Sequence, residues 1–340
     1  YVFSGGNGGW EGDYSSADST ASSRGAITVC ATDAAGERAS YSERGSNLTV
    51  CAPSADLSRT LGIQGAPTLP DVSTTALQNK YTDNFNGTSA ATPMVSGVVA
   101  LMLHANPKLT WRDVPLVLAR SARQVDPTNA GWTSYGGYHY NHEYGFGVAD
   151  ATAAVQLARS WPSVGGSSTL RQCGPYSATV NQAIPETTPV SDAVLENPFA
   201  DASGLSKAAV NGVTSRISAA GCGIQHIEHV DVVLTATDDT GARAHPSAGD
   251  LQITLTSPNG QTSTLTTPHL CYNTSGQRTN YTSGQRTNCQ GLVDFSFGIS
   301  RHLEEPAISG TSGDWTLVVA DRRTGNTGRL RNWSITLYGR

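Results

Sequence analysis

A glycine, a threonine and a serine stand directly before a long apolar segment in residues 85–103, "FNGTSAATPMVSGVVALML". A serine hydroxyl is a weak nucleophile until a neighbouring base takes its proton. At the start of a helix, unpaired N–H groups and the helix dipole favour negative charge, such as that of an oxyanion. Ser89 is therefore a candidate nucleophile, and its base has to be sought elsewhere in the chain.

The residues around Ser89 fit the start of a helix. Gly87 allows the backbone to come close to a substrate, and Pro93 is tolerated only in the first helical turn. The helix is thus predicted to begin very near Thr88 or Ser89. The tripeptide Gly-Thr-Ser is, however, a common turn and helix cap, and it recurs at residues 310–312 before a predicted strand. Only the longer string with its apolar helix indicates catalysis.

Three strings resemble one family in the same order. Residues 86–114, "NGTSAATPMVSGVVALMLHANPKLTWRDV", closely resemble the nucleophile segment of the subtilisin-like serine proteases. Residues 144–158, "YGFGVADATAAVQLA", are similar to the helix that closes their catalytic domain, and residues 3–9, "FSGGNGG", to the segment with their oxyanion asparagine. The order and spacing of the strings agree with this family, so the resemblance implies its fold and its acyl-transfer chemistry.

The branch of the family is indicated by both halves of the chain. Residues 4–13, "SGGNGGWEGD", and residues 110–122, "TWRDVPLVLARSA", resemble the kexin and furin group of proprotein convertases and its bacterial relatives. Residues 245–260 and 312–339 resemble the P domain, a β-sandwich that follows the catalytic domain in that group. The resemblance covers almost the whole chain and implies a secreted, extracellular or periplasmic, serine endopeptidase.

The resemblance assigns roles to Ser89 and Asn7. Ser89 would be the nucleophile, and its backbone N–H together with the side chain of Asn7 would form the oxyanion hole. Taken without the resemblance, Asn7 would be a left-handed turn residue beside glycines.

Asp18, aligned through "NGGWEGDYSSAD", would line the pocket for the substrate residue before the scissile bond. A buried carboxylate is costly unless a cation meets it, and an Arg or Lys side chain of the substrate would supply that cation. The resemblance therefore implies cleavage after basic residues. Capping of a turn is the alternative role of Asp18.

A calcium ion behind that pocket is also implied. Asp13 and Glu43 align with two of its carboxylate ligands, and hard oxygen donors suit Ca²⁺. The third carboxylate would lie upstream, outside this chain. The alternative is that both acids are solvated surface residues.

The general base is missing from the predicted site. In this family the chain order is Asp, His, the oxyanion Asn and then Ser, so the first two would lie upstream. None of the eight histidines stands in the His-Gly-Thr setting of the family. We therefore expect a C-terminal part of a protease, without triad-dependent activity by itself. We also expect poor solubility, because the edge of its parallel sheet would be exposed.

The elements that would position these residues change in kind along the chain. Up to residue 161, short apolar runs alternate with helix-length periodic stretches, which predicts an α/β unit. The predicted strands and helices of this part are residues 25–33, 47–53, 88–105, 110–125 and 148–161. Thr110 is a predicted N-cap, with Asp113 in a capping-box-like position. The Gly/Ser-rich residues 162–168 are a linker candidate.

Beyond this linker, apolar and polar residues alternate, and Gly, Asn, Asp and Pro turns separate the runs, which predicts an all-β sandwich. The predicted strands are residues 229–237, 250–258, 313–321 and 330–339. With the resemblance, the fold is an α/β unit, a partial subtilisin-like parallel sheet with flanking helices, followed by a jelly-roll-like sandwich. The predicted domains are residues 1–163 and 164–340.

The six cysteines are even in number and show no CxxC spacing, which favours disulfides in an oxidising compartment over a zinc or redox site. Sequential pairing is predicted, as Cys30–Cys51, Cys173–Cys222 and Cys271–Cys289. Cys30 and Cys51 lie in successive apolar runs, which suits adjacent strands. Cys271 and Cys289 bracket a polar loop in which "TSGQRTN" occurs twice. Six buried thiols are the alternative.

Composition limits the function classes. The chain has 340 residues, of which 38% are hydrophobic and 14% charged, with a formal net charge of −5. These values allow two cores and argue against a basic nucleic-acid surface or an acidic disordered tail. No apolar run reaches about 18–20 residues without polar breaks, so no membrane span is expected. The expected partners are protein or peptide substrates, with a propeptide or a chaperone left open.

A second class of function is a non-catalytic protein that binds a surface or a glycan through the sandwich and keeps a degenerate protease scaffold. A glycan-binding sandwich would usually present an exposed row of aromatic side chains. Trp315 and Trp333 both lie within alternating strands, where a core position is expected. Bracing of the catalytic domain is therefore the expected role of the sandwich.

Overall fold

The computed structural model describes residues 1–56, 74–76, 80–82, 85–191, 195, 211–271, 291–309 and 313–340. Two compact units are present. The first unit comprises Tyr1–Trp10 and Thr20–Leu170, and the second comprises Glu11–Ser19 and Arg171–Arg340. The boundary at 163/164 stays a prediction, and the short segment Glu11–Ser19 groups with the second unit.

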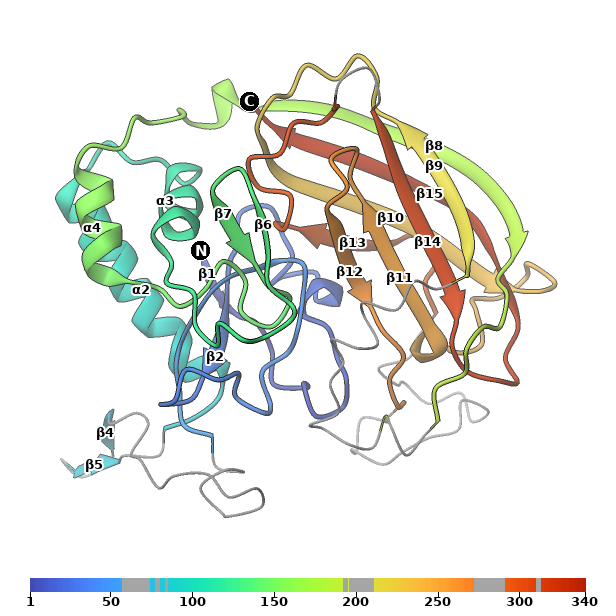
Figure 1. The fold of residues 1–340 in the computed structure, drawn as a ribbon, viewed down its shortest axis with the longest axis horizontal. Coiled ribbons are helices and arrows are strands. Elements are labelled where there is room, and N and C mark those ends of the chain that lie inside the picture. The colour runs from blue at the N-terminus through green and yellow to red at the C-terminus, as the bar shows by residue number, and fades with distance from the viewer. Residues whose placement is uncertain are drawn as a thin grey trace. The chain divides into compact units, whose positions relative to one another are not determined.

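The first unit is built on a parallel sheet of three strands in the order β1-β2-β3 (Figure 1). The strands are β1 (Val2–Ser4), β2 (Ile27–Thr32) and β3 (Leu48–Pro53). Every residue of β2 is buried, as expected of a central parallel strand covered on both faces. Both strands predicted around the first two cysteines are thus confirmed.

Three helices accompany this sheet: α2 (Thr88–Ala105), α3 (Asp113–Ser121) and α4 (Ala151–Arg159). The helix α2 packs on all three strands and on α4, which runs beside it in Figure 1. The α/β prediction and its three helices are therefore confirmed. The described residues of this unit also form two small hairpins, β4–β5 (Thr74–Ala76 and Lys80–Thr82) and β6–β7 (Thr133–Tyr135 and Tyr138–Tyr140), and a short 3-10 helix, Ser167–Thr169.

The helix α2 begins where it was predicted to begin, at Thr88. Pro93 nevertheless lies in the second turn, so the carbonyl of Ser89 lacks the N–H that would normally bond to it. By length and composition alone, α2 is apolar enough to cross a membrane, with a mean hydropathy of 1.3. One face of α2 packs on β1, β2 and β3, but only 28% of this stretch is buried.

The predicted linker is held against α3 by two neighbouring residues. Asp113 accepts hydrogen bonds from Ser163 Oγ (2.7 Å), Val164 N–H (2.8 Å) and the indole of Trp161 (3.2 Å). Arg112 Nη1 donates to the carbonyl of Gly166 at 2.9 Å. Residues 162–168 are therefore fixed to the first unit, which the Gly/Ser composition did not predict.

The start of α3 differs from the prediction. The helix begins at Asp113 rather than at Thr110. The capping-box contact does form, because Asp113 Oδ2 accepts from both the backbone N–H and the hydroxyl of Thr110, at 2.7 and 2.9 Å.

The second unit contains two antiparallel sheets of four strands each, in the orders β13-β10-β15-β8 and β12-β11-β14-β9 (Figure 1). The strands are β8 (Arg171–Ala183), β9 (Val213–Ser218), β10 (Ile227–Asp238), β11 (Leu251–Thr256), β12 (Thr262–Thr266), β13 (Phe295–Ile299), β14 (Asp314–Asp321) and β15 (Gly328–Gly339). All four predicted strands are present. The long strand β8 was missed, because a Gly-Pro pair interrupts its alternating pattern.

One apolar core lies between these strands, with Trp315 and Trp333 among its largest buried side chains. The predicted core positions of both tryptophans are confirmed. Two predicted disulfides, Cys30–Cys51 and Cys173–Cys222, are also confirmed. Cys271 is disulfide-bonded as well, and its predicted partner Cys289, like the duplicated "TSGQRTN" loop, lies outside the described residues.

Candidate active site

Ser89 is exposed on the first turn of α2, directly after a buried glycine and a buried threonine. Gly87 has a φ of 86°, which a side chain would strain, so the turn into the helix requires glycine here. Within the described residues, the Ser89 hydroxyl has no hydrogen-bond partner. Its backbone N–H is one of the unpaired donors at the helix start. The hydroxyl and an oxyanion donor are thus presented side by side.

Asn7 lies against this helix start. Its Oδ1 accepts from the backbone N–H and from the hydroxyl of Thr88, both at 2.9 Å. The Thr88 hydroxyl in turn accepts from the N–H of Gly6 at 3.3 Å. These bonds use the oxygen of the Asn7 amide, and within the described residues its Nδ2 has no acceptor. The structure therefore brings Asn7 and Ser89 together, with the Asn7 amide N–H groups free beside the Ser89 N–H.

Glu43 supports the loop that carries Asn7. Its Oε1 accepts from the N–H of Gly8 at 2.9 Å, and its own N–H donates to the carbonyl of Gly6 at 3.2 Å. A Cβ added at Gly6 would lie 2.2 Å from Glu43 Oε1, so the carboxylate fits only because residue 6 is glycine. This contact was not predicted, because the resemblance assigned Glu43 to calcium.

Tyr41 contacts both loops of the site. Its carbonyl accepts from the N–H of Gly9 at 2.9 Å. Its hydroxyl accepts from the N–H of Gly87 at 3.0 Å and donates to Ser54 Oγ at 2.7 Å. Ser54 Oγ then donates to the carbonyl of Gly87 at 3.0 Å. Both polar groups of Gly87 are therefore held by side chains from elsewhere in the unit.

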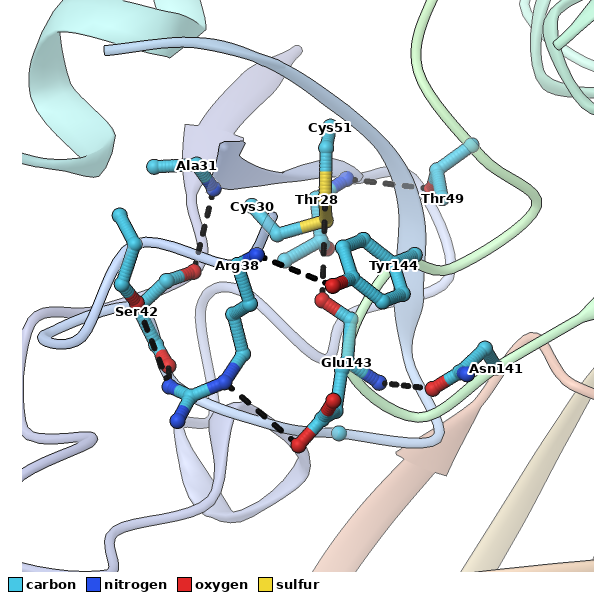
Figure 2. Close-up of a disulfide and its surroundings, with 12 residues drawn as sticks. Thr28, Cys30, Ala31, Arg38, Ser42, Thr49, Cys51, Asn141, Glu143 and Tyr144 are labelled. Atoms are coloured by element: carbon cyan, nitrogen blue, oxygen red, sulfur yellow. Dashed lines mark hydrogen bonds and ion pairs between the residues drawn. A yellow bond between two sulfur atoms is a disulfide. The ribbon is translucent and has the colours of Figure 1, made fainter. Parts of the chain in front are cut away.

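A buried ion cluster lies beside the Cys30–Cys51 disulfide. Figure 2 shows Arg38 and Glu143 facing each other there. Arg44 donates to Glu143 Oε1 through Nε at 2.8 Å and pairs with it through Nη2 at 2.7 Å, whereas Arg38 Nε lies 3.6 Å away. Arg38 Nη1 also donates to three carbonyls of its own loop, those of Ala39, Ser40 and Ser42.

Burial and pairing shift the protonation of this cluster. Burial by itself would raise the pKa of Glu143, but Arg44, Arg38 and the hydrogen bond from Asn129 overcome it and lower the pKa to about 2. Burial lowers the pKa of Arg38 to about 10, and the neighbouring Arg44 adds to this. Burial, followed by the Glu143 carboxylate, raises the pKa of Tyr144. Arg38 and Glu143 therefore both stay charged at neutral pH.

In the second unit, a serine hydroxyl, an imidazole and a carboxylate lie in contact one after the other. Ser263 Oγ lies 2.9 Å from His302 Nε2, and His302 Nδ1 lies 3.1 Å from Glu305 Oε1. The order of contacts is that of a serine protease triad. However, all three residues are fully buried, and Glu305 also accepts from Ser257 Oγ at 2.6 Å. No substrate can reach Ser263, so this is a core network.

The other two predicted site residues belong to the second unit. Asp18 follows the short 3-10 helix Ser15–Ala17 and is exposed. Asp13 is half-buried in the same segment, and it raises the pKa of Glu11 in addition to burial. Since Asn7, Glu43 and Ser89 lie in the first unit, the substrate and calcium roles of Asp18 and Asp13 stay predictions.

Sequence reasoning missed Tyr41, Ser54 and Glu143. No predicted site role rests on them, and their contacts join residues 13 to 99 positions apart. The string "ASYSERG" (residues 39–45) contains Tyr41, but the prediction used it only to assign Glu43 as a calcium ligand.

Two families match separate parts of the chain. Residues 1–147 match the Subtilase family of peptidases, and residues 227–337 match the Proprotein convertase P-domain. These regions fall in the two halves that the sequence predicted to differ in kind.

Curated relatives align with the whole chain. It is 32% identical over 345 residues to "Proprotein convertase subtilisin/kexin type 6" of Rattus norvegicus and 30% identical over 340 residues to "Protease KEX1" of Kluyveromyces lactis. The chain spans only 31% and 38% of the lengths of these relatives. Among solved structures, the fold is similar to that of the Aeromonas sobria serine protease in complex with the chaperone, with a TM-score of 0.73 at 23% identity. The alignment with that structure covers 100% of this chain and 64% of the other. The chain therefore carries a subtilase region and a proprotein convertase P-domain, and over its whole length it is similar to the proprotein convertase and kexin group.

Proposed function

We propose that this chain supplies the nucleophile and the oxyanion hole of a serine endopeptidase. The observation that carries the proposal is the arrangement at the start of α2. The Ser89 hydroxyl is exposed there, and Asn7, bound through Oδ1 to Thr88, leaves its amide N–H groups available. Two N–H donors beside an accessible serine are what a tetrahedral acyl intermediate needs.

In the proposed reaction, Ser89 Oγ attacks the scissile carbonyl carbon and gives up its proton to a base. The carbonyl oxygen becomes an oxyanion held by Asn7 Nδ2–H and the Ser89 N–H. The C–N bond then breaks, the proton passes to the leaving amine, and an acyl-enzyme remains for water to hydrolyse. Within the described residues no histidine contacts Ser89, so the base and its aspartate are proposed to come from outside this chain, which would be inactive alone.

Three finer roles follow from similarity to the group. Asp18 is proposed to select Arg or Lys before the scissile bond. Asp13 and Glu43 are proposed calcium ligands, although the described residues contain no cluster of three or more His, Cys, Asp or Glu side chains that could hold a metal. No step of the proposed reaction depends on calcium. The two disulfides support a secreted protein, for which a propeptide or chaperone is the expected folding partner.

Active-site labelling tests the function. The complete gene product is treated with a fluorophosphonate, and the labelled peptide is identified by mass spectrometry. Labelling of Ser89, its loss in Ser89→Ala and the absence of label on the buried Ser263 are expected. An unlabelled Ser89 in a folded complete product would refute the proposal. The 340-residue chain by itself should react at least about 10³-fold more slowly, because the triad base is missing.

Selectivity is tested separately. Peptides that differ only in Arg, Lys, Gln or Leu before the scissile bond are compared with wild-type protein and with Asp18→Asn. A preference for Arg and Lys that falls about 10-fold or more in Asp18→Asn is expected, since the paired charge is lost. Equal cleavage of all four peptides would show that the protease lacks basic specificity.

A further inference from the structure

We infer that Tyr41 is a positioning residue that couples the two halves of the oxyanion hole, an inference that rests on the proposed function. Nothing in the sequence marks this tyrosine. Its backbone is bonded to the loop that carries Asn7, through Gly9, and its hydroxyl is bonded to Gly87 at the turn into α2. One residue thus links the Asn7 donor to the Ser89 donor.

The hydroxyl of Tyr41 lies in a closed relay. Gly87 N–H donates to Tyr41 Oη, Tyr41 Oη–H donates to Ser54 Oγ, and Ser54 Oγ–H donates to the Gly87 carbonyl, at 3.0, 2.7 and 3.0 Å. The Tyr41 hydroxyl also lies 2.9 Å from the carbonyl of Ala55, so its one proton has two acceptors, while its oxygen accepts from Gly87 N–H in either case. Ser54 is fully buried. The relay fixes both peptide groups that flank Gly87 and so sets where the Thr88 and Ser89 N–H groups point.

The segment that carries Tyr41 is itself anchored at both ends. Arg38 and Arg44 flank it, and both approach the buried carboxylate of Glu143. Arg38 additionally bonds to carbonyls within the segment, and the Glu43 carboxylate holds the N–H of Gly8. The segment from Arg38 to Arg44 therefore holds Tyr41 in a fixed position and does not adapt to Gly87.

The rigidity matters because an oxyanion hole works only when its donors are already in position. A displacement of about 1 Å in a catalytic group can cost about 10²-fold in rate. Phenylalanine at position 41 would keep the ring but leave the buried Gly87 N–H without its acceptor. The turn would then shift or rotate, and the loss would fall on the transition state more than on substrate binding.

The test compares Tyr41→Phe, Ser54→Ala and their double variant with wild type, all in the complete gene product. For the best peptide substrate of the wild type, kcat should fall about 10- to 100-fold in each single variant while KM stays within about twofold. The double variant should lose little more than either single variant, because the relay is already broken. The rate of fluorophosphonate labelling of Ser89 should fall in parallel.

Tyr140→Phe is the matched control, since it also removes one buried hydroxyl, bonded to the Gly45 carbonyl at 2.9 Å, but touches neither Gly87 nor Asn7. It should lower the melting temperature without lowering kcat. Wild-type kcat in Tyr41→Phe, or an equal fall in Tyr140→Phe, would overturn the inference. If Tyr41→Phe failed to fold, Ser54→Ala would decide by the same criteria. Failure to label Ser89 in the wild type would instead count against the proposed function.

Discussion

Asp321 and His245 are buried next to each other in the second unit, and each keeps one polar atom without a hydrogen bond. Asp321 Oδ2 and His245 Nε2 are 3.8 Å apart, and both side chains are fully buried. Burial raises the pKa of Asp321 to about 7; the neighbouring Asp250 and Glu186 add to this, whereas a hydrogen bond from Arg323 N–H opposes it. Burial likewise lowers the pKa of His245, although the Ser247 carbonyl opposes it.

Asp321→Asn should therefore change how stability depends on pH. The pKa of Asp321 is higher in the folded state than its ordinary 3.8, so the stability that its proton contributes is present below pH 4 and is lost as the pH rises through about 7. The variant should be about 2–4 kcal/mol more stable than wild type at pH 8 and show no gain at pH 4. Thermal unfolding at the two pH values measures this. The same substitution at the exposed Asp314 is the control for the change from Asp to Asn itself.

At the scale of elements, ion pairs and hydrogen bonds hold the loop from Arg38 to Arg44 in place. Figure 2 shows Arg38 reaching both Glu143 and its own Ser42 beside the disulfide. The side chains of Arg38 and Glu143 are only 9% and 13% exposed. Removing one partner of such a pair leaves the other charge buried and unpaired, which is costly.

Glu143→Gln should destabilise the first unit in a pH-dependent way. The pKa of Glu143 is depressed from 4.5 to about 2 in the folded state, so its contribution is present above pH 4.5 and is lost as the pH falls through about 2. The variant should be about 3 kcal/mol less stable than wild type at pH 7, and this gap should close toward pH 2. Urea unfolding across this range measures the gap. The exposed Glu37, changed to Gln, provides the comparison, and a gap independent of pH would contradict the assignment.

Asp113 is a second side chain that holds a segment in place, because it binds residues 163 and 164 to the start of α3. Asp113→Ala would leave the hydrogen-bond donors of Thr110, Ser163 and Val164 without their acceptor. A loss of about 2 kcal/mol is expected, because a hydrogen bond to a charged group contributes about 1.5–3 kcal/mol and water can reach these partly exposed donors. Limited proteolysis should cut the variant within residues 162–168 much faster than wild type. Equal cutting of both would show that Arg112 alone holds the segment.

Periodicity and local motifs predicted the three helices and six of the described strands, but few of the contacts that make the site. The helix that carries Ser89 and the strands around Cys30 and Cys51 follow from apolar spacing, which is a local property. The Tyr41–Gly87 and Glu143–Arg44 bonds join distant segments, and such pairings are decided by packing of the whole unit. Asn7 was predicted only from the family resemblance, because its contacts with the distant Thr88 do not follow from local sequence patterns.

At the scale of the whole chain, α2 carries the proposed nucleophile and also has a partly exposed apolar surface. Met94, Leu101 and Leu103 are 37%, 54% and 40% exposed. Large exposed apolar side chains on one helix promote association of molecules or cover by other chain segments. The predicted poor solubility of this chain expressed alone has a physical basis in these residues.

Replacing Leu101 and Leu103 by Gln should make the isolated 340-residue chain more soluble. Less binding of a hydrophobic dye and a smaller apparent size on gel filtration are expected, because the exposed apolar area shrinks. Val293→Gln is the control, because this change removes an exposed apolar side chain of the second unit, 53% exposed, and leaves α2 unchanged. If the control improved solubility as much as the double variant, α2 would not be the cause.

The Cys30–Cys51 bond has a consequence for covalent topology. The two cysteines are register neighbours on β2 and β3, and their link closes the chain between them into a ring that contains Tyr41 and Glu43. A single backbone break inside this ring cannot separate the two fragments. A molecule cleaved there would still migrate as one species without reductant, and the segments that carry Asn7 and Ser89 would stay linked to one another.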